Sequence, residues 1–352
     1  MAKKETVGLK IGASFLSAAA VETNGSARLV QIAREPIPRG IVAGGEVKDV
    51  PALTEALKFF FKRHGLSKRH VRVGIANNRI GVRTIELTGI EDPKQVANAV
   101  RFRAQEALPI PVDQALLDYQ VLGDTVEDGQ SKKRVLLVVA YRELVDAYSL
   151  ACHGAGIKLA GVDLEAFALL RALMPPESPA GEKSALVAVS MGSERSTLGV
   201  SDGQSCEFAR VIEWGGMSLT IALSRALDID IEAAEMLKTS ISLDGAEAPE
   251  GLTPEQAALA RQALNAALQG FSRELVSSLQ FYQSQADSLG IREVVLAGGT
   301  ARLAGLAPAL QQLVGVNVRV GDPLVGISVG SKLKGGAPDA SHAVPIGLGM
   351  AL

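Results

Sequence analysis

Two stretches of the chain, Val7-Gly-Leu-Lys-Ile-Gly-Ala-Ser-Phe-Leu-Ser17 and Val187-Ala-Val-Ser-Met-Gly-Ser-Glu-Arg-Ser-Thr197, follow the same plan. Each is an apolar strand, then a glycine with small polar residues, then a second strand that runs on to Asn24-Gly25 or Asp202-Gly203. Asn-Gly and Asp-Gly are residue pairs that tight hairpin turns favour. Each stretch therefore predicts a β-hairpin with a glycine at its tip, and the repeat predicts an α/β fold with a duplicated core.

The glycine tips are candidate phosphate-binding turns. In a duplicated nucleotide-binding fold, two such tips face each other, and their backbone N–H groups bind the phosphates of ATP. A hydrolase of this kind needs an acidic residue two places before each glycine to hold metal and water, and Lys10 and Ser190 occupy those places. Since a protonated lysine cannot ligate Mg²⁺, the pattern favours a chain that holds nucleotide, or once held it, without cleaving it.

The bulk composition excludes several classes of function. The 352 residues are 47% hydrophobic and carry a net charge of −2, which suits a globular protein of two domains. Aromatic residues make up only 4%, so stacking surfaces for single-stranded nucleic acid are not expected. Cys152 and Cys206 form no C-x-x-C pair, and the four histidines lack metal-ligand spacing. We therefore expect no nucleic-acid partner, disulfide scaffold or zinc site.

The sequence also bears on membrane insertion. It has no run of 18 apolar residues, so it predicts no membrane-spanning helix. Lys3-Lys4 and the apolar stretch from Ile11 to Val21 resemble a weak signal peptide, but the same pattern recurs at 187–203, where no signal peptide can lie. We therefore expect a folded hairpin there, and a cytoplasmic protein.

Alternating strands and helices are expected along the rest of the chain. Asp92 as N-cap, Pro93 at the first helical position and Gln95 predict a helix over 93–108, which Pro109-Ile-Pro111 ends. Further strands are expected at 27–34, 71–76, 82–87, 134–140, 157–162 and 293–297, and helices from 50, from 143 and over 254–289. Residues 174–183 form the expected domain linker, and residues 326–352 are expected as glycine-rich segments ending in an apolar piece.

Nine segments of the chain resemble, in order, the PilM family of type IV pilus assembly proteins, which is part of the actin-like ATPase superfamily. They are residues 82–87, 97–108, 109–113, 117–122, 216–220, 233–238, 279–283, 296–306 and 346–352. The resemblance implies a two-lobed α/β fold of the actin-like (ribonuclease H-like) type, with duplicated α/β core subdomains and an FtsA-type inserted subdomain. It divides the chain into a lobe-one core (1–88 and 161–182), the insert (89–160), a lobe-two core (183–213 and 292–352) and a lobe-two helical subdomain (214–291).

The same resemblance implies a scaffold on the inner face of the cytoplasmic membrane, held there through a partner rather than by direct insertion. It would bind the short N-terminal cytoplasmic peptide of a PilN-like bitopic membrane protein and work with other pilus platform proteins and the motor ATPase. The peptide is expected in a groove between the lobe-one core and the insert, a common mode of peptide recognition. The candidate contacts are Val96, Val100, Leu108 and Ile110, for which plain core packing is the alternative.

By the same resemblance, the candidate nucleotide-binding residues fall into four groups. They are Lys10, Gly12, Ala13 and Ser14 at the first tip; Gly192, Ser193, Ser196 and Thr197 at the second; Glu235 and Lys238 facing ribose and adenine; and Gly298, Gly299 and Thr300 at the adenosine turn. Each also has an interpretation as a turn residue or a solvent-facing charge. Without the two acidic residues, hydrolysis should be negligible and Mg²⁺ should not be held tightly. The hypothesis is a pseudo-ATPase with no catalytic residue, whose cleft is a relic or binds ATP without metal, Lys10 contacting a phosphate directly.

Two other functions stay open. An active ATPase or kinase on the same fold would need a general-base aspartate, and Asp163 and Asp202 are the remaining candidates. An FtsA-like, filament-forming cytoskeletal protein would usually end in an amphipathic membrane helix, whereas residues 344–352 contain no lysine or arginine.

Overall fold

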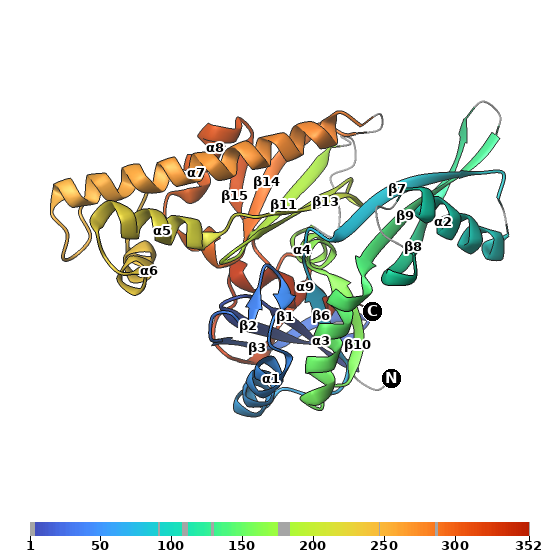
Figure 1. Cartoon of the computed structure of the whole chain (residues 1–352), viewed down its shortest axis with the longest axis horizontal. Coiled ribbons are helices and arrows are strands. Elements are labelled where there is room, and N and C mark those ends of the chain that lie inside the picture. The colour runs from blue at the N-terminus through green and yellow to red at the C-terminus, as the bar shows by residue number, and fades with distance from the viewer. Residues whose placement is uncertain are drawn as a thin grey trace.

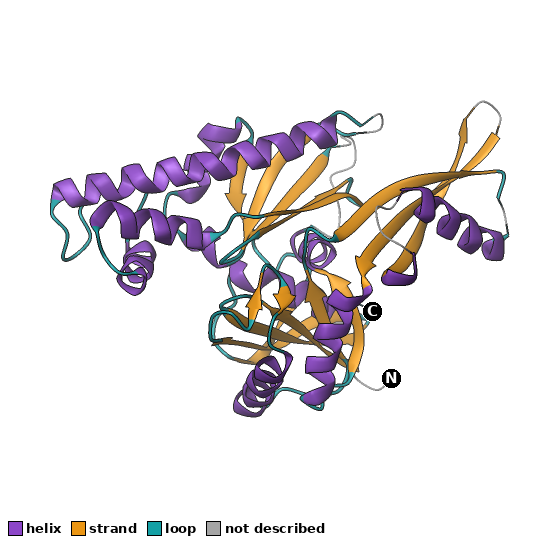
Figure 2. Cartoon of the chain, in the orientation of Figure 1, coloured by secondary structure: helices purple, strands orange, loops and turns teal. Residues whose placement is uncertain are grey.

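The computed structural model describes residues 4–90, 92–107, 112–127, 130–174, 184–245, 247–285 and 288–351. These residues form two α/β lobes and a smaller three-stranded subdomain that projects from lobe one (Figure 1). Each lobe is built on a central sheet, and the helices pack against the sheets (Figure 2). Within the described residues, no helix combines the length and the apolar content needed to cross a bilayer.

Lobe one is built on a six-stranded sheet in the order β10-β6-β1-β2-β3-β16. Strands β1 and β2 form the first predicted hairpin, with Ile11 opposite Leu16, and β6 lies parallel to β1 on its other side. The bounds are β1 Lys4–Ile11, β2 Phe15–Asn24, β3 Ser26–Pro36, β4 Val42–Ala43, β5 Glu46–Val47, α1 Val50–His64, β6 Val71–Ile75, α3 Arg142–Gly154, β10 Leu159–Leu164 and β16 Ser328–Lys334.

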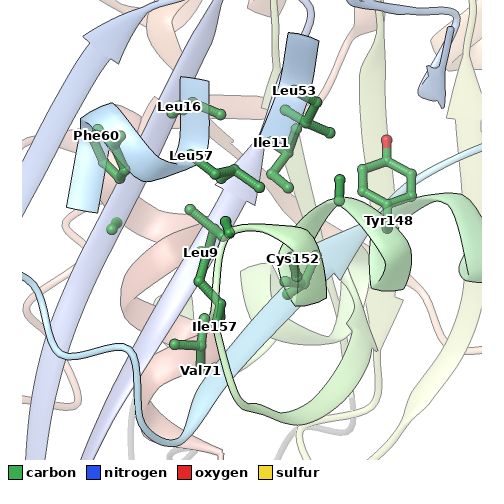
Figure 3. Close-up of a cluster of buried hydrophobic side chains, with 14 of the residues drawn as sticks. Leu9, Ile11, Leu16, Leu53, Leu57, Phe60, Val71, Tyr148, Cys152 and Ile157 are labelled. Carbon is green, nitrogen blue, oxygen red and sulfur yellow. The ribbon is translucent and has the colours of Figure 1, made fainter. Parts of the chain in front are cut away.

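The core of lobe one lies between this sheet and helices α1 and α3 (Figure 3). Alternate strand residues such as Leu9 and Ile11 point to the helix face, where they meet Leu57 and Cys152. Burial of each such aliphatic side chain stabilises the lobe by about 1.5–3 kcal/mol. Helix α1 is positioned at its start by Asp49, whose side chain accepts a hydrogen bond from the backbone N–H of Ala52.

Lobe two repeats this arrangement on a five-stranded sheet in the order β13-β12-β11-β14-β15. Strand β11 corresponds to β1, because it has an antiparallel hairpin partner, β12, on one side and a parallel strand, β14, on the other. The predicted duplication of the α/β core is therefore confirmed. The bounds are β11 Ala185–Met191, β12 Ser196–Ser201, β13 Cys206–Ile212, α5 Gly216–Leu227, α6 Ile231–Ser240, α7 Pro254–Gln283, β14 Ile291–Ala297, η2 Gly299–Arg302, α8 Leu306–Val314 and β15 Asn317–Val320.

The insert is a three-stranded antiparallel sheet in the order β7-β9-β8 with helix α2 beside it (Figure 1). Its elements are β7 Ile80–Thr88, α2 Pro93–Ala107, η1 Val112–Gln114, β8 Ala115–Glu127 and β9 Gln130–Tyr141. The predicted bounds of 89–160 differ from this grouping, because the sheet begins at Ile80 while α3 and β10 belong to lobe one. The sequence pattern predicts the strand at 82–87 but places it in the lobe-one core. In the structure this strand pairs with residues 132–140 of the insert, because local sequence does not reveal which sheet a strand joins.

Two helices, α4 (Glu165–Leu173) and α9 (Ala343–Met350), pack against each other between the two sheets. Helix α9 lies very close to its neighbours. A Cβ atom at Gly347 would lie 1.8 Å from the carbonyl oxygen of Ala168, and one at Gly8 would lie 2.0 Å from that of Pro345. Glycine is required at both positions because only a hydrogen atom fits there.

The segment 326–352 differs most from the sequence-based expectation. Instead of glycine-rich segments belonging to the lobe-two core, it holds β16, which pairs with β3 of lobe one, a short η3 turn (Ala340–His342) and the buried helix α9. Helix α9 contains Pro345 and two glycines, which are poor helix formers. Burial of almost every residue of this apolar helix between the sheets outweighs that low propensity.

Candidate functional site: the junction of the two glycine tips

The two predicted glycine tips lie against each other where the lobes meet. Ser14 Oγ, at the β1–β2 tip, donates a hydrogen bond of 2.9 Å to Ser193 Oγ, at the β11–β12 tip. Both tips are closed turns, since the N–H of Gly12 donates to the Phe15 carbonyl and that of Gly192 donates to the Arg195 carbonyl. Gly12, Ala13 and Ser14 are half-buried there. We call this region, residues 10–15 together with residues 190–195, the tip junction.

Lys10 links Glu165 of lobe one to Ser190 of lobe two beside the two tips. Its Nζ lies 2.8 Å from Oε2 of Glu165 and donates a hydrogen bond of 3.4 Å to the Ser190 hydroxyl. Glu165 is only 6% exposed, so the ammonium neutralises a buried carboxylate. Lys10 and Ser190, which stand at the two positions where a hydrolase of this kind was expected to carry acidic residues, are therefore joined to each other across the lobes.

The donor set at this place does not suit a magnesium ion. Mg²⁺ prefers several carboxylate and water oxygens, whereas the Glu165 carboxylate beside the tip junction is paired with an ammonium and the Glu194 carboxylate accepts a hydrogen bond from the Gly44 N–H. Over the ranges that the structure describes, no group of three or more His, Cys, Asp or Glu side chains could hold a metal ion.

Glu165 is a functional candidate that the sequence pattern did not single out. It is the first residue of α4 and follows β10 directly, at the carboxyl end of two parallel strands, where ligands bind in many α/β folds. The available signal was an acidic residue just after a predicted strand. Of the two aspartates considered as general bases, Asp163 pairs with Arg171 at 3.2 Å. Asp202 accepts hydrogen bonds from the backbone of its own turn.

Glu235 and Lys238 form a second polar cluster in lobe two. Lys238 Nζ lies 2.6 Å from Glu235 and donates to the Thr220 hydroxyl at 2.8 Å and to the Gly216 carbonyl at 3.1 Å. Burial lowers the pKa of Lys238, although hydrogen bonding to Glu235 opposes the shift. Burial acts to raise the pKa of Glu235, but hydrogen bonds from Lys238 and Thr220 outweigh it and leave the pKa below its usual value. Both charges are thus held next to the start of α5.

The predicted adenosine turn packs against the second tip. Gly298 has a φ of +87°, and a Cβ there would lie 2.4 Å from the Met191 carbonyl oxygen. Thr300 Oγ1 donates a hydrogen bond of 3.0 Å to the Gly192 carbonyl. Gly299 faces lobe one, because a Cβ there would lie 3.3 Å from Nη2 of Arg34. An arginine of lobe one, absent from the prediction, therefore lies at the expected adenosine turn.

Two predicted residues of the second tip face the interior of lobe two. Ser196 is fully buried, and its hydroxyl donates a hydrogen bond of 2.8 Å to the Trp214 carbonyl. Thr197 is 5% exposed on the same strand. The Ser196 hydroxyl is therefore bonded within lobe two rather than to the Ser14–Ser193 pair.

The predicted partner contacts on α2 are core residues in this structure. Val96 and Val100 are 2% and 1% exposed, and they pack with the strands of the insert. The reason is that α2 has one apolar face and needs it to cover the three-stranded sheet. Leu108 and Ile110 lie outside the described residues.

A surface pocket of about 530 Å³ lies on lobe one, on the same side as the insert. It is lined by Asp146, Ser149, Leu150 and His153 of α3 and by residues 157–159, which lead into β10. Leu150 is 60% exposed. Strand β10 is an edge strand, paired only with β6 within the described sheets. We call this the α3 pocket.

Two lobes with duplicated sheets, an insert in lobe one and paired hairpin tips define the actin-like ATPase class of α/β proteins, and solved structures agree. A chain of a "PilM-PilN type IV pilus biogenesis complex" matches at 25% identity with a TM-score of 0.79, covering 99% of this chain and 98% of that one. The ethanolamine utilization protein EutJ from Carboxydothermus hydrogenoformans matches at 14% identity and a TM-score of 0.58, covering 99% and 90%. MreB5 of Spiroplasma citri bound to ADP matches at 11% and 0.56, covering 98% and 94%.

A comparison of the amino-acid sequence with models of protein families shows which family the chain belongs to. The model of the type IV pilus assembly protein PilM family matches residues 8–352, nearly the whole chain. The chain belongs to this family, and the resemblance and the fold class predicted from the nine segments are confirmed.

Proposed function

We propose that the chain is a cytoplasmic scaffold of the type IV pilus assembly platform and binds the N-terminal cytoplasmic peptide of a PilN-like membrane protein. The observation that carries this proposal is its similarity, at 25% identity over 99% of its length, to a protein solved in a PilM–PilN complex. The membrane location comes through that partner. Other platform proteins and the motor ATPase would then be reached through the same assembly.

We place the peptide at the α3 pocket. An extended peptide needs a free strand edge for its backbone and an apolar recess for its side chains. Among the described strands, β10 has a free edge, and Leu150 and Leu159 offer apolar surface beside it. Asp146, His153 and Lys158 surround that surface with polar groups. This location replaces the predicted contacts Val96 and Val100 on α2, because both of these side chains are buried.

A binding measurement on the full chain tests this proposal. A synthetic peptide with the N-terminal cytoplasmic sequence of the PilN-like protein encoded with this chain is titrated by fluorescence anisotropy. The variant Leu150→Glu should weaken binding about tenfold or more, since it puts a charge on the apolar recess. Met236→Glu is the matched control, because Met236 is an exposed apolar residue, 74% accessible, on a helix of lobe two.

The possible results separate the function from its location. If the peptide does not bind the unaltered chain, the proposed function is wrong. If it binds and both variants bind equally well, the function stands but the α3 pocket is not the site.

We also propose that the tip junction is the remnant of a nucleotide site and that the chain is a pseudo-ATPase. The Lys10–Glu165 pair supports this, because the Lys10 ammonium stands where a hydrolase of this kind would carry a metal-binding carboxylate. Calorimetric titration with ATP, with and without Mg²⁺, tests the idea. Absence of binding, or binding that ignores Mg²⁺, agrees with it, whereas a Mg²⁺-dependent ATPase activity abolished by Gly192→Ala would favour the active ATPase or kinase.

A further inference from the structure

Lobe two reaches into lobe one through two consecutive residues of its tip, Glu194 and Arg195. Glu194 Oε2 accepts a hydrogen bond of 3.0 Å from the backbone N–H of Gly44. The Arg195 side chain is only 9% exposed. Its guanidinium lies against Gly45, since a Cβ atom there would be 2.3 Å from Nη2. Both contacts are made to the turn between β4 and β5, which we call the glycine turn.

The glycine turn is fixed from the side of lobe one. Gly44 and Gly45 have φ values of +60° and +62°, in the left-handed region that glycine adopts freely. Asn77 Nδ2 donates to the Gly44 carbonyl at 2.9 Å, and the Tyr148 hydroxyl donates to the Gly45 carbonyl at 3.0 Å. Figure 3 shows the Tyr148 hydroxyl directed away from the other labelled side chains. Arg195 therefore meets a turn whose backbone is already held in place.

The Arg195 guanidinium is buried with few polar partners in the described part of the chain. Neither Nη1 nor Nη2 has a hydrogen-bond partner within the described part of the chain, and Nη1 lies 3.6 Å from Glu213. A buried guanidinium that lacks hydrogen bonds is less favourable than one in water. Packing on the glycine turn and the neighbouring tip contacts must offset this difference. Arg195 therefore holds the closed arrangement through its packing on the glycine turn.

We propose that Glu194 and Arg195 form a clasp that holds the two lobes together with no ligand between the tips. The Ser14–Ser193 and Lys10–Ser190 hydrogen bonds join the same two lobes beside the clasp. The clasp lies on the tip strand of lobe two and on the glycine turn of lobe one, and it requires neither the α3 pocket nor the partner peptide. It is therefore a property of the chain beyond the proposed function.

Hydrogen exchange and small-angle scattering on the full chain, without nucleotide, test the clasp. In Glu194→Ala/Arg195→Ala, amide exchange over residues 42–47 should become about tenfold faster, and the radius of gyration should increase. Arg210→Ala/Glu274→Ala is the matched control, because it removes a 3.2 Å ion pair and the Arg210–Ser278 hydrogen bond, both within lobe two and away from the glycine turn. Its exchange over 42–47 and its radius should match those of the unaltered chain.

Single variants keep the test decisive if the double variant folds poorly. Glu194 is exposed, so Glu194→Ala should fold and still accelerate exchange at the Gly44 N–H. Arg195→Lys keeps the charge but loses the planar contact. It should accelerate amide exchange over residues 42–47 less than the double variant does. Unchanged exchange at 42–47 in Glu194→Ala would overturn the proposal. So would a marked compaction of the unaltered chain on adding ATP, because its lobes would then not be closed beforehand.

Discussion

The ammonium of Lys10 and the carboxylate of Glu165 lie 2.8 Å apart, and this pair joins strand β1 to the first residue of helix α4. Both residues belong to lobe one, and the Ser190 hydroxyl of lobe two lies on the other side of the same ammonium. Because Glu165 is 6% exposed, water reaches its carboxylate poorly and the Lys10 ammonium compensates the buried charge.

Replacement of the cation alone should therefore be costly. Lys10→Met leaves a buried carboxylate without a partner and should lower the free energy of unfolding by about 3 kcal/mol. Urea denaturation followed by circular dichroism measures the change. The double variant Lys10→Met/Glu165→Gln removes both charges and should recover most of the loss. Equal losses in the single and double variants would show that the ion pair does not account for the effect.

Aspartates in place of Lys10 and Ser190 should make ATP binding depend on Mg²⁺. In Lys10→Asp/Ser190→Asp, two carboxylates lie near Glu165 and the ammonium is gone, which suits Mg²⁺. Calorimetry should then show that Mg²⁺ tightens ATP binding about tenfold or more, whereas the unaltered chain is expected to show no such dependence. Lys10→Asn/Ser190→Asn is the control, since it opens similar space without charge. A gain of Mg²⁺ dependence in this control would count against the explanation.

Two helical glycines should respond to alanine in opposite ways. Gly347→Ala in α9 would put a Cβ 1.8 Å from the Ala168 carbonyl oxygen and should destabilise the chain by about 3 kcal/mol. Gly270→Ala in α7 has no atom within 4 Å of the new Cβ and should stabilise it by about 0.5–1 kcal/mol. Thermal and urea unfolding of both variants check this. Similar behaviour of the two would mean that α9 is not packed as closely as described.

The Glu293–Arg319 pair should make stability depend on pH. Arg319 donates two hydrogen bonds, of 2.8 and 3.0 Å, to the Glu293 carboxylate and ties β15 to β14. These bonds hold the pKa of Glu293 below its usual value, against the opposing effect of burial. Since the folded-state pKa is the lower one, the pair stabilises the fold above the unfolded-state pKa, about 4.3. That contribution is lost as the pH falls through the folded-state pKa.

Comparison of Glu293→Gln with the unaltered chain measures this contribution. The variant should be less stable at pH 7, and the difference should shrink below about pH 4, as the carboxylate of the unaltered chain becomes protonated. Glu55→Gln, which removes an exposed ion pair with Lys58 on α1, should show little difference at any pH. A difference for Glu293→Gln that stays constant down to acid pH would contradict the sign of the pKa shift.

The repeated part of the fold could be predicted because its signals are local. Each hairpin is encoded within about twenty consecutive residues by alternating apolar residues, a tip glycine and a turn pair. Lys10 and Ser190 could likewise be recognised as departures, because each stands at a fixed distance from a glycine. In the structure the two sheets share a central order, β6-β1-β2-β3 in lobe one and β14-β11-β12-β13 in lobe two, and they differ in the strands added at their edges.

The remaining features depend on contacts between distant segments. Arg34 and Arg195 become site residues only when the lobes are assembled, and no short pattern marks them. Glu165 had only a weak signal, an acidic residue just after a predicted strand, and its contact with Lys10 joins distant segments of lobe one. The apolar stripe containing Val96 and Val100 looks the same whether it covers a sheet or binds a peptide, and in the structure it covers the sheet. The glycine- and proline-containing segment of α9 has low helix propensity, and its burial between the lobes decides its structure.

The position of β16 and α9 also fixes the order in which the chain can finish folding. Ser328 bonds to Ala27, which lies 301 residues earlier, and Arg34 bonds to Ser341, which lies 307 residues later. On the ribosome, β1, β2 and β3 emerge first, but their edge strand and covering helix are synthesised only after all of lobe two. The lobe that is made first is thus completed last. Until then its apolar surface stays open to chaperones and to aggregation.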